Sequence, residues 1–174
     1  MPMQTLTRGG LLRLGAAATL GVVPPDADLA FARLLVATEL LSDDFYTRAI
    51  AAGAPGPLHE ARANERAHYH GLAALMRQAG QTPAQAGDID FSYPHGAFAS
   101  PESIHRLGAE LEKLQLGSYL GAADALASEP LRGIVSRIAA NEAQHLTMFE
   151  PFHSSFPVAL AIAQASDVLG RYTS

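Results

Sequence analysis

Apolar residues recur along most of the chain at the three- and four-residue spacing of amphipathic helices, and Gly and Pro divide this pattern into segments. The first segment runs to about residue 50, and Asp26 or Asp28 can cap its start, because a short acidic side chain accepts hydrogen bonds from free backbone N–H groups. Gly and Pro in 53–57 end this segment, and a second runs over about 58–79. The two segments predict a pair of antiparallel helices.

A second pair of helices is expected in the other half of the chain. Residues 100–102, Ser-Pro-Glu, form a strong helix start, because Ser caps the helix, Pro fits its first position and an acid favours its positive end. This third helix should reach about Ser128, where 129–130, Glu-Pro, breaks it, and a fourth should run over about 131–150. A shorter apolar helix over 157–169 is expected to cover one end of the bundle.

The stretch 80–100 between the two pairs lacks helical periodicity and contains several Gly and Pro. A loop of this length inside a compact domain usually has a function. In a four-helix bundle that function is to cross from one end to the other. The prediction is therefore an all-α chain: a four-helix bundle of two antiparallel hairpins, a long crossover and a short C-terminal helix.

Composition narrows the classes of protein that fit. The chain is 48% hydrophobic but only 7% aromatic, and the Ala and Leu that dominate it favour helices. The formal net charge is −5 and Lys and Arg form no cluster, so we do not expect a nucleic-acid partner. The absence of Cys excludes disulfides and thiolate metal ligands without deciding the cellular compartment.

Residues 1–25 differ in character from the rest of the chain. Two arginines and no acid precede the weakly apolar run 14–23, an order typical of an export signal and too short to span a bilayer. Residues 7–13, TRGGLLR, resemble a twin-arginine motif in which Gly9 replaces the second arginine. We expect a leader that directs the folded domain, 26–174, to the periplasm or another extracytoplasmic location. A leader that stays in the cytoplasm is the alternative.

A Glu and a His three residues apart lie on one helix face and can bind one cation together. This Glu-x-x-His pattern occurs four times, as Glu65/His68, Glu102/His105, Glu142/His145 and Glu150/His153. Glu102 lies in the first turn of a helix, where an acid is expected for capping alone. Pro151 separates the members of the last pair, so they do not share a regular helical face. Two pairs therefore remain as candidates.

The two remaining pairs lie in duplicated sequence. Residues 63–68, ANERAH, return as ANEAQH at 140–145. Upstream of each copy a Glu is followed seven residues later by a Tyr, as Glu39 with Tyr46 and as Glu112 with Tyr119. Duplication of a helix hairpin that supplies one Glu and then one Glu-x-x-His explains both repeats. It predicts a two-metal site with six ligands: Glu39, Glu65, His68, Glu112, Glu142 and His145.

The order Glu, Glu-x-x-His, crossover, Glu, Glu-x-x-His resembles the ferritin-like superfamily, which includes ferritins, rubrerythrins and manganese catalases. The closest resemblance is to the small, often exported bacterial ferritin-like domain proteins, through 38–46, 91–98 and 111–123. It extends over essentially the whole chain from residue 7. The resemblance implies a ferritin-like four-helix bundle that holds two metal ions.

The resemblance also implies a role for each ligand. Glu65 and Glu142 would bridge the two metal ions. The terminal ligands would be Glu39 and Glu112, with one imidazole for each metal from His68 and His145. Carboxylate oxygens with a few imidazoles suit iron or manganese, so we expect two Fe or Mn ions, whose four positive charges would balance four carboxylates.

Other polar residues near these six are assigned less directly. Tyr46 and Tyr119 fit equally a hydrogen bond to a ligand carboxylate, a radical relay or ordinary core packing. Asn64 and Asn141 lie about 100° around the helix from their neighbouring Glu and should bond at the surface or between helices. The remaining histidines are expected to lie outside the site: His59, His70, His95, His105 and His153.

Two adjacent Fe(II) or Mn(II) ions can pass two electrons to O₂ or H₂O₂. The leading hypothesis is therefore metal oxidation or peroxide or O₂ consumption in protection against oxidative stress, with a manganese-catalase-like cycle as a variant. The alternative is a non-enzymatic metal-binding or structural bundle of the cell envelope, and storage of iron in a hollow shell is a third hypothesis. Whether the protein is an enzyme, and whether it forms a dimer or another oligomer, stays open. No stable membrane span is expected.

Overall fold

A computed structural model describes residues 26–150 and 157–173 of the protein. Its elements are α1 (Asp26–Ala51), α2 (Pro57–Gln78), η2 (Ala86–Asp88), α3 (Pro101–Ala125), α4 (Glu129–Phe149) and α5 (Ile162–Leu169). Within these ranges no strand forms, and Phe91 and Thr173 make an isolated β-bridge. The prediction of an all-α chain is confirmed.

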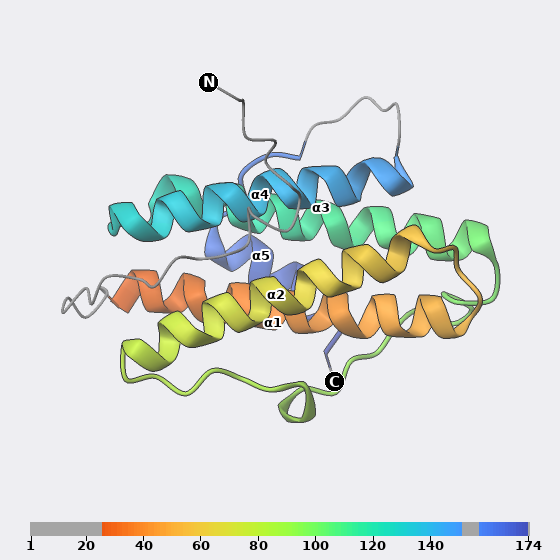
Figure 1. The fold of residues 1–174 in the computed structure, drawn as a ribbon, viewed down its shortest axis with the longest axis horizontal. Helices are drawn as coiled ribbons and strands as arrows, with labels where there is room; N and C mark the ends of the chain where they lie inside the picture. The colour runs from red at the N-terminus through yellow and green to blue at the C-terminus, as the bar shows by residue number, and fades with distance from the viewer. Residues whose placement is uncertain (1–25, 151–156, 174) are drawn as a thin grey trace, which may run out of the picture.

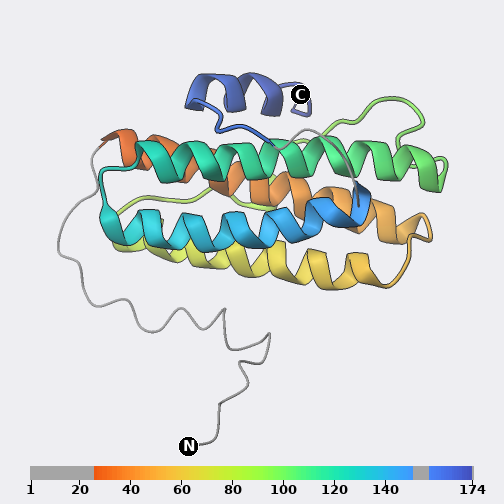
Figure 2. The same cartoon turned by 90° about the horizontal axis from the view of Figure 1, so that it is seen from above.

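Helices α1 to α4 form a bundle of two antiparallel hairpins, α1 with α2 and α3 with α4 (Figures 1 and 2). Seen from above in Figure 2, α1 and α3 lie in one layer, α2 and α4 lie in the other, and α5 lies outside the first layer. The closely packed pairs of bundle helices are α1 with α2, α3 with α4 and α1 with α3. Helices α2 and α4 therefore stand further apart than the other neighbours.

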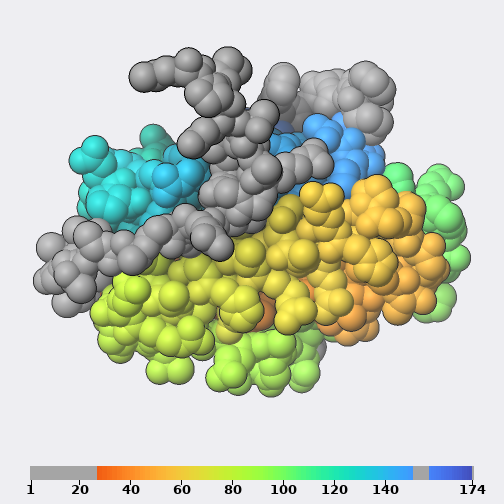
Figure 3. Space-filling view, viewed as in Figure 1, coloured from red at the N-terminus to blue at the C-terminus, as the bar shows by residue number. Residues whose placement is uncertain are grey.

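The crossover between α2 and α3 runs along the bundle from one end to the other, as predicted (Figure 1). In the space-filling view its green residues lie along the outer edge of the α1/α2 hairpin (Figure 3). The Tyr93 hydroxyl donates to Asp44 Oδ2 of α1 at 2.9 Å, and the Tyr69 hydroxyl of α2 donates to the Ala84 carbonyl at 2.9 Å. These bonds attach the crossover to both helices of the first hairpin.

The turn between α3 and α4 is held by a buried acid. α3 ends at Ala125 rather than near Ser128, and Glu129 and Pro130, predicted as a break, are the first two residues of α4. The carboxylate of Asp28 accepts hydrogen bonds from the backbone N–H groups of Ala127 and Ser128, at 2.9 and 3.0 Å. Asp28 thus lies inside the first turn of α1 and caps the α3–α4 turn instead of its own helix.

Helix α5 is shorter than predicted and covers the side of the bundle rather than its end. It packs against α3 and α1. The segment before it lies directly on the α3 backbone, where the Leu160 N–H donates to the Gly117 carbonyl at 2.9 Å. A Cβ on Gly121 would lie 1.9 Å from the Leu160 carbonyl oxygen. Two glycines on α3 therefore direct the tail to the bundle's flank.

The predicted leader, 1–25, lies outside the described residues, so its export role stays a prediction. Among the helices that the structure describes, none has a stretch that is both long enough and apolar enough to cross a lipid bilayer. The N-terminal cap predicted at Ser100 is confirmed, because its Oγ accepts a hydrogen bond from the Ser103 N–H at 3.1 Å.

Candidate metal centre

Acidic and imidazole side chains from all four bundle helices meet inside the bundle. They are Glu39 of α1, Glu65 and His68 of α2, Glu112 of α3, and Glu142 and His145 of α4. The four carboxylate residues have no solvent exposure, and the two His are at most 3% exposed. Each Glu-x-x-His pair shares one helix face, which points both side chains inward. All six predicted residues are therefore brought together.

The six residues form two overlapping groups of four. Site A consists of Glu39, Glu65, His68 and Glu142, and site B consists of Glu65, Glu112, Glu142 and His145. Within each group one ligand atom per residue lies within 4.8 Å of all the others. Glu65 and Glu142 belong to both groups, the two residues expected from the resemblance to bridge a metal pair. The geometry thus offers two adjacent positions that share two carboxylates.

Each imidazole approaches a shared carboxylate of the opposite hairpin through Nδ1. His68 Nδ1 lies 2.9 Å from Glu142 Oε1, and His145 Nδ1 lies 2.7 Å from Glu65 Oε1. The two ring centroids are 6.4 Å apart. The duplicated hairpins therefore face each other across the cluster, and each contributes to both sites.

Several polar atoms of the cluster make no hydrogen bond of acceptable geometry. One oxygen of each carboxylate and both nitrogens of one imidazole are among them: Glu39 Oε2, Glu65 Oε1, Glu112 Oε2, Glu142 Oε1, and His68 Nδ1 and Nε2. A buried polar atom without a partner costs about 1–3 kcal/mol. Divalent iron or manganese would give these oxygen and nitrogen atoms a partner, since both metals accept this mixture of ligands. The residues present fit a two-metal site.

Two buried tyrosines each hold a carboxylate of the other hairpin. The Tyr46 hydroxyl of α1 donates to Glu112 Oε1, and the Tyr119 hydroxyl of α3 donates to Glu39 Oε1. Burial and the adjacent carboxylate raise the pKa of each phenol well above its ordinary value, so both hydroxyls stay protonated donors. Of the interpretations left open for Tyr46 and Tyr119, the structure supports the hydrogen bond to a candidate ligand.

A third polar contact was not predicted. Gln115 Nε2 of α3 donates to Glu65 Oε2 at 2.8 Å, and the Ser42 hydroxyl of α1 donates to Gln115 Oε1 at 3.0 Å. Both residues are about 1% exposed. Position 115 lies as far from position 42 as Glu112 lies from Glu39, so the two positions correspond in the duplication. From the sequence alone, Gln115 could have been singled out because it lies at a duplicated position three residues after the predicted ligand Glu112.

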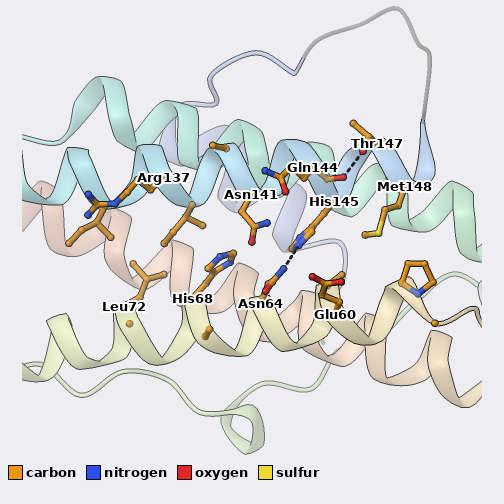
Figure 4. Close-up of a pocket in the computed structure, with 18 residues that line it drawn as sticks. Glu60, Asn64, His68, Leu72, Arg137, Asn141, Gln144, His145, Thr147 and Met148 are labelled. Atoms are coloured by element: carbon orange, nitrogen blue, oxygen red, sulfur yellow. Dashed lines mark hydrogen bonds between the residues drawn. The ribbon is translucent and has the colours of Figure 1, made fainter. Parts of the chain in front are cut away.

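Asn64 lies between helices, as predicted. Its amide Nδ2 is 3.2 Å from His145 Nε2, which connects α2 to α4 (Figure 4). Its counterpart Asn141 has a buried Oδ1 that makes no hydrogen bond. His59, His70, His95 and His105 are exposed and lie outside the cluster, as expected, whereas His153 lies outside the described residues.

Burial and mutual repulsion shift the pKa values of the cluster. Burial, reinforced by the charge of Glu65, raises the pKa of both Glu39 and Glu112 well above the ordinary range. Burial alone would also raise the pKa of Glu65, but contacts with His145 and His68 lower it to about 2. Burial alone would lower the pKa of His145, but the surrounding carboxylates raise it to about 11. Without metal the cluster therefore retains protons at neutral pH.

A groove between α2 and α4 leads from the surface to the cluster. It has a volume of about 1140 Å³, and its walls include His68, His145, Asn64 and Asn141 (Figure 4). The groove follows from the wider separation of α2 and α4. It lies on the imidazole side of the cluster, whereas α1 and α3 pack against each other on the opposite side.

Comparison with known proteins identifies the family. The family model for the ferritin-like domain matches residues 27–153, a range that contains all six residues of the cluster. No match to a curated protein was found. The matched range also contains the whole of α2, α3 and α4 and nearly all of α1. Because the match covers most of the chain, the protein belongs to the ferritin-like domain family.

Proposed function

We propose that this ferritin-like protein is a di-iron or di-manganese carboxylate protein, with one metal ion in site A and one in site B. The observation that carries the proposal is the sharing of Glu65 and Glu142 by two complete groups of ligands. Two separate mononuclear sites would have no reason to share carboxylates. A structural acidic cluster would place counter-charges such as Lys or Arg beside its acids, whereas within 26–150 and 157–173 the ion-pair partners of these four Glu are His68 and His145.

Charge balance supports a pair of divalent cations. Four buried carboxylates repel one another, and part of that repulsion is relieved in the metal-free state by protons, as the raised pKa values of Glu39 and Glu112 indicate. Two divalent ions would carry four positive charges against the same four carboxylates once those protons leave. The loaded cluster would then be neutral, which is the favourable state for a site without solvent exposure.

The chemistry that such a metal pair supplies when bound is two-electron exchange with O₂ or H₂O₂. The protein's own residues would hold the pair and regulate access to it. Tyr46 and Tyr119 hold the terminal carboxylates in place, and Gln115 holds Glu65. The groove between α2 and α4 has both imidazoles in its walls, and we propose that a small oxidant enters through it. We therefore propose metal oxidation or peroxide consumption in protection against oxidative stress.

The leader, 1–25, would direct the protein out of the cytoplasm, and this export would place the activity in the periplasm or another extracytoplasmic location. The absence of Cys leaves no thiolate for an electron-relay centre, which disfavours a rubrerythrin-style peroxidase with an attached electron carrier. A manganese-catalase-like cycle belongs to the same proposal, with H₂O₂ as both oxidant and reductant.

Elemental analysis of natively expressed protein tests the proposal. We expect about two Fe or Mn ions per chain and consumption of H₂O₂ by the same sample. Glu65→Ala should lose most of the metal, because it removes a ligand from both sites. Glu102→Ala is the matched control, since Glu102 belongs to a Glu-x-x-His pair outside the cluster and is exposed. A metal-free protein whose stability is unchanged by Glu65→Ala would instead support a structural, non-enzymatic bundle.

A further inference from the structure

The two metal positions are related by duplication, but the residues around them are not equivalent. The tyrosine contacts are equivalent in the two halves, because each tyrosine donates to a terminal carboxylate of the other hairpin. The contacts of the amide side chains differ between the two halves. Gln115 corresponds to Ser42, and Asn64 has a contact to a candidate ligand that its counterpart Asn141 lacks.

The shared carboxylates differ in how firmly they are held. Gln115 donates to Glu65 Oε2, the oxygen on the His68 side, whereas Glu65 Oε1 lies 2.7 Å from His145 Nδ1. Ser42 is too short to do the same for Glu142, and its hydroxyl donates to Gln115 instead. Among the described residues the ion-pair partners of Glu142 are His68 and His145, which are themselves candidate ligands. Glu65 therefore offers site B an oxygen whose close neighbour is another candidate ligand, and offers site A one that already accepts an amide hydrogen.

The two imidazoles also differ in how firmly they are held, and the difference again favours site B. His145 Nε2 contacts the Asn64 amide at 3.2 Å, whereas both nitrogens of His68 lack a hydrogen bond of acceptable geometry. When Nδ1 of a histidine binds a metal, Nε2 keeps the ring proton and needs an acceptor. The Asn64 amide, whose Nδ2 faces His145 Nε2 in the structure, would provide one once a rotation brings its oxygen to that place. His145 Nε2 thus has an amide partner within reach, and His68 Nε2 has none among the described residues.

From these contacts we propose that sites A and B bind metal with different affinities, that site B fills first, and that Asn64 is the positioning residue responsible. The inference rests on the proposed two-metal function. At site B three ligands are each held by a residue outside the cluster: Glu112 by Tyr46, Glu65 by Gln115 and His145 by Asn64. Site A shares Glu65, has Glu39 held by Tyr119, and has no such support for its imidazole.

Calorimetric titration of the metal-free, full-length protein with Mn(II) tests this proposal. We expect two binding events whose affinities differ by about 10-fold or more, because partners that orient a metal ligand typically change metal affinity by about 10–100-fold. Asn64→Ala should weaken the tighter event by this factor and leave the weaker event in place. Asn64→Asp, which keeps an acceptor oxygen, should retain most of the tight binding. A purely structural role of Asn64 would not produce that rescue.

Asn141→Ala is the matched control, because position 141 on α4 duplicates position 64 on α2. Its binding curve should match that of the unmodified protein, and thermal unfolding of each metal-free variant verifies that the bundle is intact. Two events of equal affinity, or equal weakening by Asn64→Ala and Asn141→Ala, would overturn the inequivalence while leaving the two-metal proposal intact. Absence of Mn(II) and Fe(II) binding by the unmodified protein would overturn the proposed function itself.

Discussion

Tyr119 of α3 donates a hydrogen bond to Glu39 of α1, and neither side chain has any solvent exposure. The bond joins the two hairpins through a candidate metal ligand, so it couples packing of the bundle to geometry of the site. Because Glu39 uses Oε1 for this bond, Oε2 is directed to the cluster, where it has no hydrogen-bond partner. The phenol thus decides which oxygen is available to a metal.

We expect Tyr119→Phe to weaken Mn(II) binding at site A by about 10-fold or more, because the ring still fills the core while the orienting bond is lost. Calorimetric titration measures this. Tyr69→Phe is the control, since the Tyr69 hydroxyl donates to the Ala84 carbonyl outside the cluster. That variant should lose some stability to urea and no metal affinity. Equal Mn(II) affinity in Tyr119→Phe and the unmodified protein would show that the phenol does not position Glu39.

Metal binding should release protons and should weaken as the pH falls. The raised pKa values of Glu39 and Glu112 keep these carboxyls protonated in the metal-free protein, and His145, with a pKa of about 11, is also protonated. An incoming cation must displace these protons. Mn(II) titrations in buffers of different ionisation enthalpy measure the release, and an affinity independent of pH would contradict the shifts.

The same shifts determine how the stability of the metal-free protein depends on pH. The folded-state pKa of His145, about 11, exceeds its ordinary value of 6.5. Protonation of His145 therefore contributes its full stabilisation below pH 6.5, and this stabilisation is lost as the pH rises through 11. The metal-free protein should therefore become less stable to urea from neutral to alkaline pH. Metal-loaded protein should lose less over the same interval, because the cation takes the place of the proton.

Replacing Asp28 tests the connection between α1 and the α3–α4 turn. Asp28→Ala leaves the backbone N–H groups of Ala127 and Ser128 without their acceptor, and we expect a loss of about 1–3 kcal/mol in the free energy of unfolding. Urea unfolding measures it. Asp124→Ala, which removes an exposed acid near the end of α3, should cost much less. Equal stability of the two variants would contradict the capping role.

Docking of the tail on α3 depends on Gly121. Gly121→Ala would place a methyl group 1.9 Å from the Leu160 carbonyl oxygen, so the tail must move and stability should fall by about 1–3 kcal/mol. Gly133→Ala on α4 is the control, because nothing lies within 4 Å of the added carbon. Alanine should stabilise that exposed helical position by about 0.5–1 kcal/mol. Thermal unfolding distinguishes the two, and a stabilising effect at both positions would contradict the docking.

The four long helices and the six clustered residues were predictable because they depend on local information. Helix periodicity and the Gly and Pro breaks locate the helices, and the duplication selects two of four Glu-x-x-His pairs. The selection of Glu112 needed only its distance to Tyr119 along the same helix. These features can be recognised in the sequence alone because residues that share a helix face are three, four or seven positions apart.

The features that were missed depend on contacts between distant segments. The pairing of Asp28 with the turn at Ser128 joins residues 100 positions apart in the chain, and the capping preference of Asp pointed instead to its own helix. The place of α5 depends on Gly121, whose lack of a side chain matters only where Leu160 crosses it. Gln115 lies at a duplicated position, but its bond to Glu65 follows from the way α3 packs inside the bundle.

Anomalous diffraction from crystals of natively metallated protein tests the two-metal centre most directly. Data collected at the iron and manganese absorption edges should reveal two adjacent peaks inside the bundle, with Glu65 and Glu142 between them. The peak beside His145 should be the stronger when metal is limiting. No peak at these carboxylates, or a single peak that does not contact both shared residues at full loading, would contradict the account.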